Sequence, residues 1–417
     1  MDRQYKDSGI EWIGKIPETW EVDRFKNKFK TGKGLNITKG DLVPEGIPVV
    51  SYGQVHSKQN TGTHLDDILI RYIPSRLAEE GVSSKVSVGD FIFADTSEDI
   101  DGCGNAVYVD KEIGLYAGYH SVIAFAKHPE ESKFYAYLFL TECWRSQIRM
   151  RVTGIKVFSI SQAILNETTI ILPPLAEQQL IADFLDRKCG EIDRLIALQE
   201  QMIAQLTDCK QSVIIESVTK GLNPDAQLVP SGIDWIGNVP EEWKVAKAKY
   251  FVEINNGSDP KEEGNIPVYG SGASSFKTCG EYKEGPTVLI GRKGATLHIP
   301  HFIEGKYWNV DTAFDVKIKK EMILRYYYYL AICFDYKYYI SQTTLPGMAQ
   351  SSYYNMLIPV PPLTEQRAIS EHLDVKCCEI DRLIETKRQK IESLRDYKKS
   401  VIYEAVTGKS DIYIIAN

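Results

Sequence analysis

The sequence lacks the long apolar segments that membrane proteins contain. Its 417 residues include no run of about 18 apolar side chains, and the opening MDRQYKDSG has no apolar stretch of the kind found in signal peptides. Apolar residues make up 43% of the chain and charged residues 25%, as is usual for globular proteins. We therefore expect a cytoplasmic protein without membrane contact, long enough for several domains.

Cysteine spacings typical of metal sites or redox motifs are also missing. None of the eight cysteines forms a C-x-x-C pair, and Cys377 and Cys378 are adjacent in the chain. We expect reduced, mostly buried thiols and no metal site.

Motifs that carry catalysis are absent as well. The chain has no GxxxxGK[ST] phosphate loop, no GxGxxG after a strand, no H-E-x-x-H pair and no Asn-Pro-Pro-aromatic signature of amino-methyltransferases. The acidic cluster Asp95, Glu98, Asp99 and Asp101 lacks the ligand order of a calcium loop, which favours a solvated or structural loop. We therefore predict no catalytic, metal-binding or cofactor-binding residue in this chain.

An excess of positive charge is also lacking, since the formal net charge is −7. Taken alone, this argues against a protein wrapped in nucleic acid. Two segments are nevertheless basic, and by themselves both are most simply solvated surfaces. These segments contain Arg24, Lys26, Lys28, Lys30 and Lys33, and Lys387, Arg388, Lys390, Arg395, Lys398 and Lys399.

What the chain does contain is a duplication. Residues 173–221 begin PPLAEQQ and continue through EIDRLI, and residues 361–409 begin PPLTEQR and continue through EIDRLI. A shorter motif precedes each β-rich region: SGIEWIGKIPETWEV at 8–22 and SGIDWIGNVPEEWKV at 231–245. A period of half the chain indicates two tandem half-molecules and not a solenoid of small repeats.

Each of the two longer blocks is predicted to be a helix of about 30 residues, or about 45 Å. Paired prolines mark its start, and apolar residues then recur at spacings of three and four, as in a coiled coil. Two matching helices in one chain favour an intramolecular antiparallel pair. The predicted seam consists of Ile192, Leu195, Met202, Leu206, Cys209 and Val213, and of Ile380, Leu383, Ile391, Leu394, Tyr397 and Val401.

The regions between the helices are rich in short β-branched and aromatic runs cut by Gly, Asp and Asn. Residues 23–172 and 246–359 present such runs in the same order, although few side chains are shared. We therefore predict an α+β fold with two similar β-rich domains separated by two long antiparallel helices, in a pseudo-twofold tandem repeat. The predicted domains are 1–172, 173–221, 222–360 and 361–417.

Polar and cationic residues on loops of both β-rich regions are candidates for contact with DNA. Gly291-Arg292-Lys293-Gly294 places two cations in a tight turn after a strand, which suits close approach to phosphates. Loops 153–161 and 346–352 carry hydroxyl and amide groups that can contact phosphates or base edges. The predicted DNA-contacting residues are Lys33, Lys58, Arg71, Arg76, Lys156, Arg292, Lys293, Gln350 and Tyr353.

The duplicated tryptophans and the EQ pair of each helix start are candidates for contact with a partner protein. Tryptophan buries a large area, so these motifs are expected to dock onto something fixed in each half, either the core or a partner. The residues are Trp12, Trp20, Trp235, Trp243, Glu177, Gln178, Glu365 and Gln366.

The repeated combination of WIGxxPxxW, a variable β-rich region, PPLxEQ and a long EIDRLI helix resembles the specificity subunits of type I restriction-modification enzymes. The resemblance covers nearly the whole chain. It implies two target-recognition domains, each reading one half of a split double-stranded DNA sequence, and helices that set the spacing and bind two methyltransferase subunits. It further implies that S-adenosylmethionine, ATP and Mg act only on partner polypeptides, among them the restriction and translocase subunits.

Two alternatives remain open at this point. One is a coiled-coil scaffold whose β-rich domains bind protein. The other is a DNA methyltransferase or nuclease whose active site has no recognisable motif.

Overall fold

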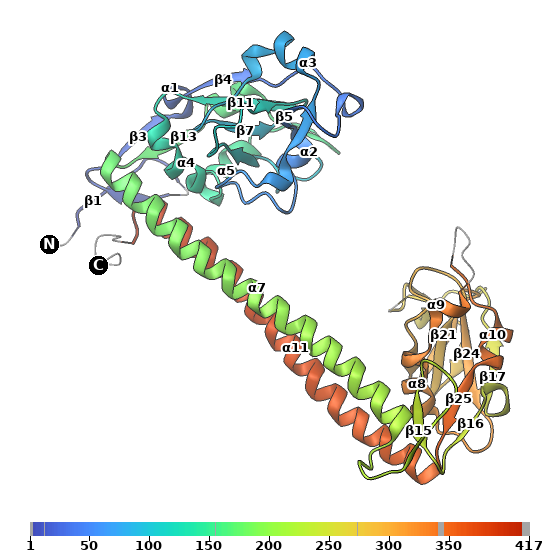
Figure 1. The fold of residues 1–417 in the computed structure, drawn as a ribbon. Helices are drawn as coiled ribbons and strands as arrows, with labels where there is room; N and C mark the ends of the chain where they lie inside the picture. Colours follow the sequence, from blue (N-terminus) through green and yellow to red (C-terminus); the bar gives the residue numbers. More distant parts are fainter. Residues whose placement is uncertain (1–2, 12, 155, 273, 341–345, 411–417) are drawn as a thin grey trace. The chain divides into compact units, whose positions relative to one another are not determined.

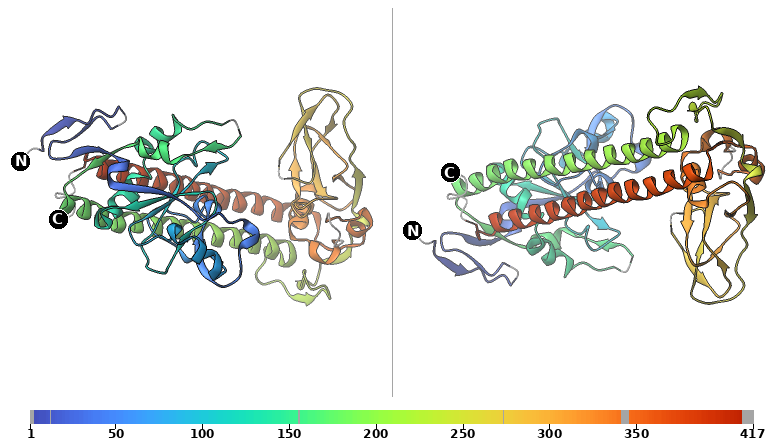
Figure 2. Two further views of the ribbon diagram at one scale, coloured as in Figure 1. Left: turned by 90° about the horizontal axis from the view of Figure 1, so that it is seen from above. Right: turned by 90° about the horizontal axis from the view of Figure 1, so that it is seen from below.

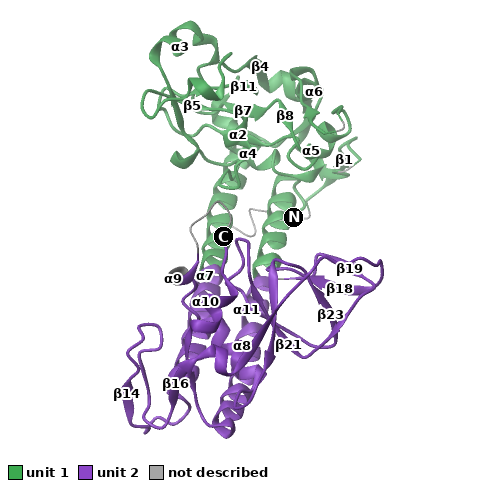
Figure 3. Ribbon diagram, turned by 90° about the vertical axis from the view of Figure 1, so that its right-hand side faces the viewer, with its two compact units in different colours: residues 1–198, 391–417 green, residues 199–390 purple. Residues whose placement is uncertain are grey.

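The computed structural model describes residues 3–11, 13–154, 156–272, 274–340 and 346–410 (Figure 1). It separates into two compact units, residues 1–198 with 391–417 and residues 199–390 (Figure 3). Each unit therefore contains one β-rich region together with a part of each long helix.

The first unit is built on a four-stranded antiparallel sheet and a smaller sheet beside it. The larger sheet has the order β4 (Phe29–Lys33), β11 (Ser121–Ala126), β7 (Phe91–Ala94) and β9 (Ala106–Tyr108). In the smaller one, β5 (Ile47–Val50) pairs parallel with β10 (Tyr116–Ala117) and antiparallel with β6 (Arg71–Ile73). Strand β7 is buried along its whole length, as expected for its uniformly apolar sequence Phe-Ile-Phe-Ala. Its aromatic side chains pack with those of α4 (Ser132–Leu138) and α5 (Glu142–Arg149).

The second unit repeats this arrangement. Its larger sheet has the order β17 (Val252–Asn256), β24 (Ala313–Ile318), β21 (Thr287–Gly291) and β22 (His301–Ile303), again antiparallel. In its smaller sheet, β18 (Ile266–Tyr269) pairs parallel with β23 (Lys306–Asn309) and antiparallel with β19 (Lys277–Cys279), while β20 (Lys283–Glu284) pairs with β23. Helix α8 (Leu324–Cys333) takes the place of α4. The prediction that the two β-rich regions fold alike is confirmed.

A pair of short strands closes each β-rich region just before its helix. Strand β3 (Glu21–Arg24) pairs with β13 (Thr169–Leu172), and β16 (Lys244–Lys247) pairs with β25 (Leu357–Val360). The preceding motifs form small hairpins, β1 (Tyr5–Asp7) with β2 (Lys15–Pro17) and β14 (Leu228–Pro230) with β15 (Asn238–Pro240). The beginning and end of each region are thereby held together where the long helix starts.

The two long helices are α7 (Leu175–Lys220) and α11 (Leu363–Val406), of 46 and 44 residues. They are longer than the predicted 30 residues because no further proline lies between the paired prolines and the glycines Gly221 and Gly408, and the single glycine in this stretch, Gly190, is accommodated within α7. Both glycines have positive φ, the conformation that commonly ends a helix. Within each unit, part of α7 runs antiparallel to part of α11 (Figure 2). Among the described residues, no helix combines the length and apolar character that a membrane span needs.

The coiled-coil seam is present but lies one residue away from the predicted one at several positions. Leu195 (47% exposed), Leu383 (50%) and Tyr397 (51%) face solvent, as does Cys209, so the prediction is wrong for these four. Gln199 and Lys387 interrupt the predicted seam and also belong to the observed one. The lysines at seam positions 210 and 398 conceal the true register, because a search for apolar residues selects the adjacent Cys209 and Tyr397. Residues that are buried or half-buried at alternating spacings of three and four are Cys189, Ile192, Ile196, Gln199, Ile203, Leu206 and Lys210 in α7, and Cys377, Ile380, Ile384, Lys387, Ile391, Leu394 and Lys398 in α11.

Ion pairs between the helices repeat the twofold pattern of the seam. In the second unit, Lys210 of α7 lies 2.7 Å from Asp381 of α11. In the first unit the roles are exchanged, since Lys398 of α11 lies 2.7 Å from Asp193 of α7. The two lysines occupy matching repeat positions, and so do the two aspartates, so each unit has the same antiparallel pairing.

Candidate nucleic-acid interface

In the second unit, loops that are far apart in the sequence meet at the end of β21. The Arg292 amide donates to the Thr312 carbonyl (2.8 Å), and the Met348 amide donates to the Arg292 carbonyl (2.8 Å). The Gly294 amide donates to the carbonyl of Pro346 (2.9 Å). The two loops that the sequence singled out, 291–294 and 346–352, therefore lie side by side and form a strand-end cluster with residues 310–312.

The first unit builds the same cluster at the end of β7. The Asp95 amide donates to the His120 carbonyl (3.1 Å), and the Ile160 amide donates to the Asp95 carbonyl (2.7 Å). The sheet registers agree, because Ala94 pairs with Ser121 as Gly291 pairs with Ala313. Asp95 and Arg292 thus occupy equivalent backbone positions in the two units.

A glycine holds the neighbouring strand against each cluster. A Cβ on Gly34 would lie 1.9 Å from the Gly118 carbonyl oxygen, and a Cβ on Gly257 would lie 2.1 Å from the Val310 carbonyl oxygen. Neither position can accept a side chain without displacing backbone. This close approach brings residues that follow β4 and β17 to the strand ends.

The cluster of the first unit opens into a groove of about 730 Å³. Lys33, Asn36, Asp95, His120 and Gln162 are among the residues that line it. The groove therefore combines one lysine, two amides and one carboxylate, which are groups that can contact phosphates and base edges.

The predicted DNA-contacting residues differ in how far they reach the surface. Lys33, Lys58, Arg71, Arg76 and Lys156 are exposed in the first unit, and Arg292 and Lys293 are half-buried in the second. Arg71 donates to the carbonyls of Ile68 and Ile70, while Arg76 forms a loose ion pair with Glu80 (3.8 Å). Only Lys33 lines the strand-end groove of the first unit.

The two remaining predicted residues both form hydrogen bonds with backbone carbonyls of the second unit, and they differ in burial: Tyr353 is buried and Gln350 is half-buried. Tyr353 is 1% exposed, and its hydroxyl donates to the Gly291 carbonyl (2.7 Å). It holds the loop in place and offers DNA no surface, which corrects the expectation of direct contact. Gln350, at the start of α10 (Gln350–Asn355), donates to the Ile254 carbonyl.

Six of the eight residues predicted to contact a partner protein connect each tryptophan motif to its helix. The Trp20 indole donates to Glu177 (2.8 Å) and the Trp243 indole donates to Glu365 (2.9 Å). Gln178 and Gln366 are buried and donate to the carbonyls of Pro173 and Pro361. These six side chains are therefore occupied by packing within the chain. Trp235 is half-buried against Phe334, and Trp12 lies outside the described residues.

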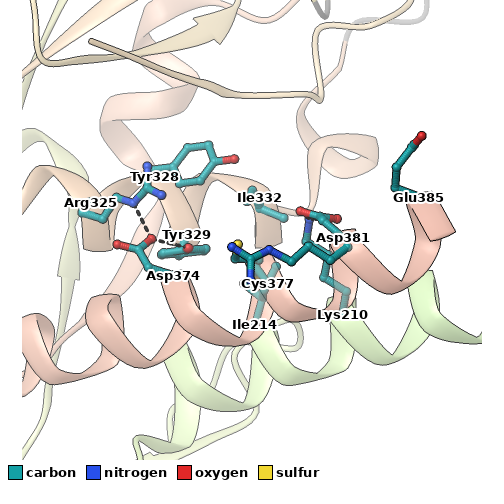
Figure 4. A pocket seen from close by; sticks show the side chains of 12 residues that line it. Lys210, Ile214, Arg325, Tyr328, Tyr329, Ile332, Asp374, Cys377, Asp381 and Glu385 are labelled. Carbon is teal, nitrogen blue, oxygen red and sulfur yellow. Dashed lines mark hydrogen bonds and ion pairs between the residues drawn. The ribbon is translucent and has the colours of Figure 1, made fainter.

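A second set of polar contacts, which the sequence did not reveal, joins the short helix of each unit to a long helix: α8 to α11 in the second unit and α4 to α7 in the first. In the second unit, Arg325 and the Tyr329 hydroxyl both donate to Asp374, each at 2.6 Å (Figure 4). The Arg325 guanidinium also lies 4.4 Å from the centroid of the Phe302 ring. Burial, followed by the bond to Asp374, raises the pKa of Tyr329 above its ordinary value, so the phenol stays protonated.

The first unit contains the same arrangement with lysine in place of arginine. The Tyr137 hydroxyl donates to Asp186 (2.5 Å), and Lys133 lies 3.2 Å from the same carboxylate and 5.4 Å from the centroid of the Tyr108 ring. Asp186 and Asp374 occupy matching positions of the duplicated helical blocks, in the sequences Phe-Leu-Asp and His-Leu-Asp. Aligning the two halves would have identified these residues.

Comparison with known proteins follows the same division of the chain. The model of the type I restriction modification DNA specificity domain matches twice, at residues 17–208 and 240–394. The chain belongs to this family. As a type I restriction-modification specificity subunit, it has two tandem target-recognition domains, an arrangement that fits a two-part DNA target. The comparisons do not favour a protein-binding scaffold or an unrecognised enzyme.

Individual relatives agree with this assignment. The chain is 24% identical to the putative type I restriction enzyme MjaX specificity subunit of Methanocaldococcus jannaschii, over 95% of each chain. It is 27% identical to the MjaVIII specificity subunit of the same organism, over 66% of this chain and 69% of the relative. A solved structure from a study of complex assembly and conformational transition of the type I R-M system has the same fold, with a TM-score of 0.71, 16% identity and coverage of 94% and 98%.

Proposed function

We propose that each unit reads one half of a two-part, asymmetric double-stranded DNA target through its strand-end cluster. The observation that carries this is the equivalence of the two clusters. Their backbones make the same hydrogen bonds, whereas their side chains differ, with Asp95 in one unit and Arg292 in the other. A constant scaffold with variable loop residues is suited to reading two different sequences.

Additional contacts with DNA come from cations on the flanking loops. We assign this role to the cations Lys33, Lys58, Arg71, Arg76, Lys156 and Lys293. Arg292 and Gln350 are assigned to contact with the bases. Lysine and arginine contacts to phosphate hold a protein in register on the duplex without reading its sequence. Because the chain carries a net charge of −7, further positive surface would come from partner subunits around the DNA.

The long helices have two functions in this proposal. They set the spacing between the half-sites, and they bind two methyltransferase subunits. Leucines at matching repeat positions support the second function: Leu175 and Leu363 are 42% and 49% exposed, and Leu195 and Leu383 are 47% and 50% exposed. The same exposed surface occurring twice is suited to two copies of one partner.

The chemistry is assigned to other polypeptides. Methyl transfer with S-adenosylmethionine, and ATP- and Mg-dependent translocation and cleavage, belong to the methyltransferase and restriction subunits of the complex. We retain domains 1–172, 173–221, 222–360 and 361–417 as functional divisions, although the compact units divide within the helices.

Salt-dependent binding of the assembled methyltransferase to DNA tests the proposal. Replacing both Arg292 and Lys293 with Ala should weaken binding to the target more than binding to scrambled DNA, because a base contact is lost together with a phosphate contact. Loss of one phosphate contact lowers the slope of log affinity against log salt by about 1. Lys306→Ala, which removes a cation that stacks on Tyr282, is the matched control. Unchanged affinity of the double variant for both DNAs would show that this loop does not touch DNA.

A further inference from the structure

The two units place opposite charges at one equivalent backbone position, the residue that follows the central strand. This position is Asp95 after β7 and Arg292 after β21, and its amide and carbonyl make matching hydrogen bonds in both units. Since the surrounding backbone is the same, the difference in chemistry lies in the side chain. Resting on the function proposed above, this equivalence bears on which bases each half-site contains.

We propose that Asp95 and Arg292 are specificity-determining residues that read complementary chemistry in the two half-sites. Arg292 donates to a guanine, whose O6 and N7 both accept hydrogen bonds in the major groove. Asp95 accepts from an exocyclic amino group, N4 of cytosine or N6 of adenine, because an ionised carboxylate can only accept. The two half-sites therefore differ, since the base-contacting side chain at this position is negatively charged in one unit and positively charged in the other.

The surroundings of Arg292 leave its guanidinium available. The guanidinium carbon lies over the Phe314 ring, 5.8 Å from the ring centroid. Among the described residues, the guanidinium donates one long hydrogen bond, to the Asp311 carbonyl (3.4 Å). The nearby Asp311 carboxylate instead faces Lys293, whose Nζ lies 3.6 Å away. An aromatic support and few internal bonds leave most of the five N–H donors for a base.

The surroundings of Asp95 are equally suited to an acceptor. Its side chain is 35% exposed and lines the groove of about 730 Å³ with Lys33 and Gln162. Asp95 Oδ1 is itself buried, lies 3.3 Å from His120 Nδ1 and accepts no hydrogen bond from any described residue, so the rest of the carboxylate is the part that is open to a base. Lys33 in the same groove offsets the repulsion between the carboxylate and the DNA phosphates.

The experiment compares the methylated sequence and the DNA affinity of this chain assembled with its methyltransferase subunits. The variants are Asp95→Asn, Arg292→Ala and Arg292→Lys, with Asp67→Asn and Lys306→Ala as controls that remove exposed charges elsewhere. Duplexes carry each single-base change of the parent target. Thermal unfolding verifies that every variant is folded.

Arg292→Ala should lower discrimination at one guanine of one half-site, by about 5-fold to 150-fold, and Arg292→Lys should retain part of it. Asp95→Asn should change the preferred base at one position of the other half-site only, because an amide both donates and accepts and pairs well with adenine. The parent preference at that position distinguishes cytosine from adenine. Both control variants should keep the parent sequence.

Parent selectivity in folded Asp95→Asn and Arg292→Ala complexes would overturn this inference while leaving the proposed function intact. An equal loss of affinity for all sequences would also overturn it, since that indicates a phosphate contact. A parent complex that neither binds nor methylates any defined sequence would instead refute the proposed function itself.

Discussion

Two tryptophan indoles each donate a hydrogen bond to the glutamate that begins a long helix. Trp20 with Glu177 and Trp243 with Glu365 are equivalent pairs, 2.8 Å and 2.9 Å long. The sequence indicates that these tryptophans dock onto something fixed, because four of the six tryptophans lie in the duplicated motifs. It does not indicate the partner, since Trp20 and Glu177 are separated by 157 residues and only the fold brings them together.

Removing one of these glutamates should destabilise the unit to which it belongs. In Glu365→Ala the buried Trp243 N–H loses its acceptor, which should lower the free energy of unfolding by about 1–3 kcal/mol. Glu371→Ala, on the exposed surface of the same helix, should change it by less than about 0.5 kcal/mol. Chemical denaturation of both variants measures the difference. Equal stabilities would mean that the indole bond contributes nothing.

Buried tyrosines predict a loss of stability in alkaline solution. Burial, followed by Asp110 and Asp186, raises the pKa of Tyr108 to about 12, and burial with Asp315 raises the pKa of Tyr307 to about 12. Because an unfolded tyrosine titrates near pH 10, this contribution is fully present below about pH 10 and is lost as pH rises toward 12.

Tyr108→Phe isolates this effect, because phenylalanine does not ionise. As the pH rises from 9 to about 12, the free energy of unfolding should decrease in both proteins, and the decrease should be about 1–2 kcal/mol smaller in the variant than in the parent. Denaturation at each pH measures this difference. Tyr250→Phe, at a position 63% exposed, should follow the parent. A Tyr108→Phe variant with the parent's pH dependence would show that this phenol does not control alkaline unfolding.

At the scale of the elements, the seam of the long helices shows where sequence patterns suffice and where they fail. Apolar periodicity correctly predicts Ile192, Ile380, Ile391 and Leu394 as buried residues. Around Leu383 the sequence offers the adjacent apolar pair Leu383-Ile384, and periodicity alone does not choose between them. In the structure Ile384 is buried and Leu383 is exposed, and the same register places Lys210 and Lys398 beside their aspartate partners on the other helix.

This adjacent pair allows a direct test of the register. Ile384→Ala removes a side chain that is 8% exposed and should cost about 2–4 kcal/mol of unfolding free energy. Leu383→Ala removes one that is 50% exposed and should cost less than about 1 kcal/mol. Thermal or chemical denaturation distinguishes the two. If Leu383→Ala were the more damaging variant, the seam would follow the sequence-based register after all.

At the scale of the whole molecule, internal duplication is what made the architecture predictable. Repeated motifs predicted two similar domains and a pair of antiparallel helices, and the sheets of the two units have the same strand order. The strand-end clusters were only partly predictable. Lys293 and Gly347 form a β-bridge over a sequence separation that no local pattern encodes, and the equivalence of Asp95 with Arg292 depends on sheet register.

Exchanging one β-rich region for the other tests the central claim, that each unit reads its own half of the target. A chain in which residues 244–360 are replaced by a copy of residues 21–172 keeps both helices and the strand pairs that close each region. Assembled with the methyltransferase subunits, it should methylate a sequence whose two half-sites contain the same bases, at the parent spacing, as mapped across cellular DNA. Methylation of the parent's asymmetric sequence by this chain would contradict the account.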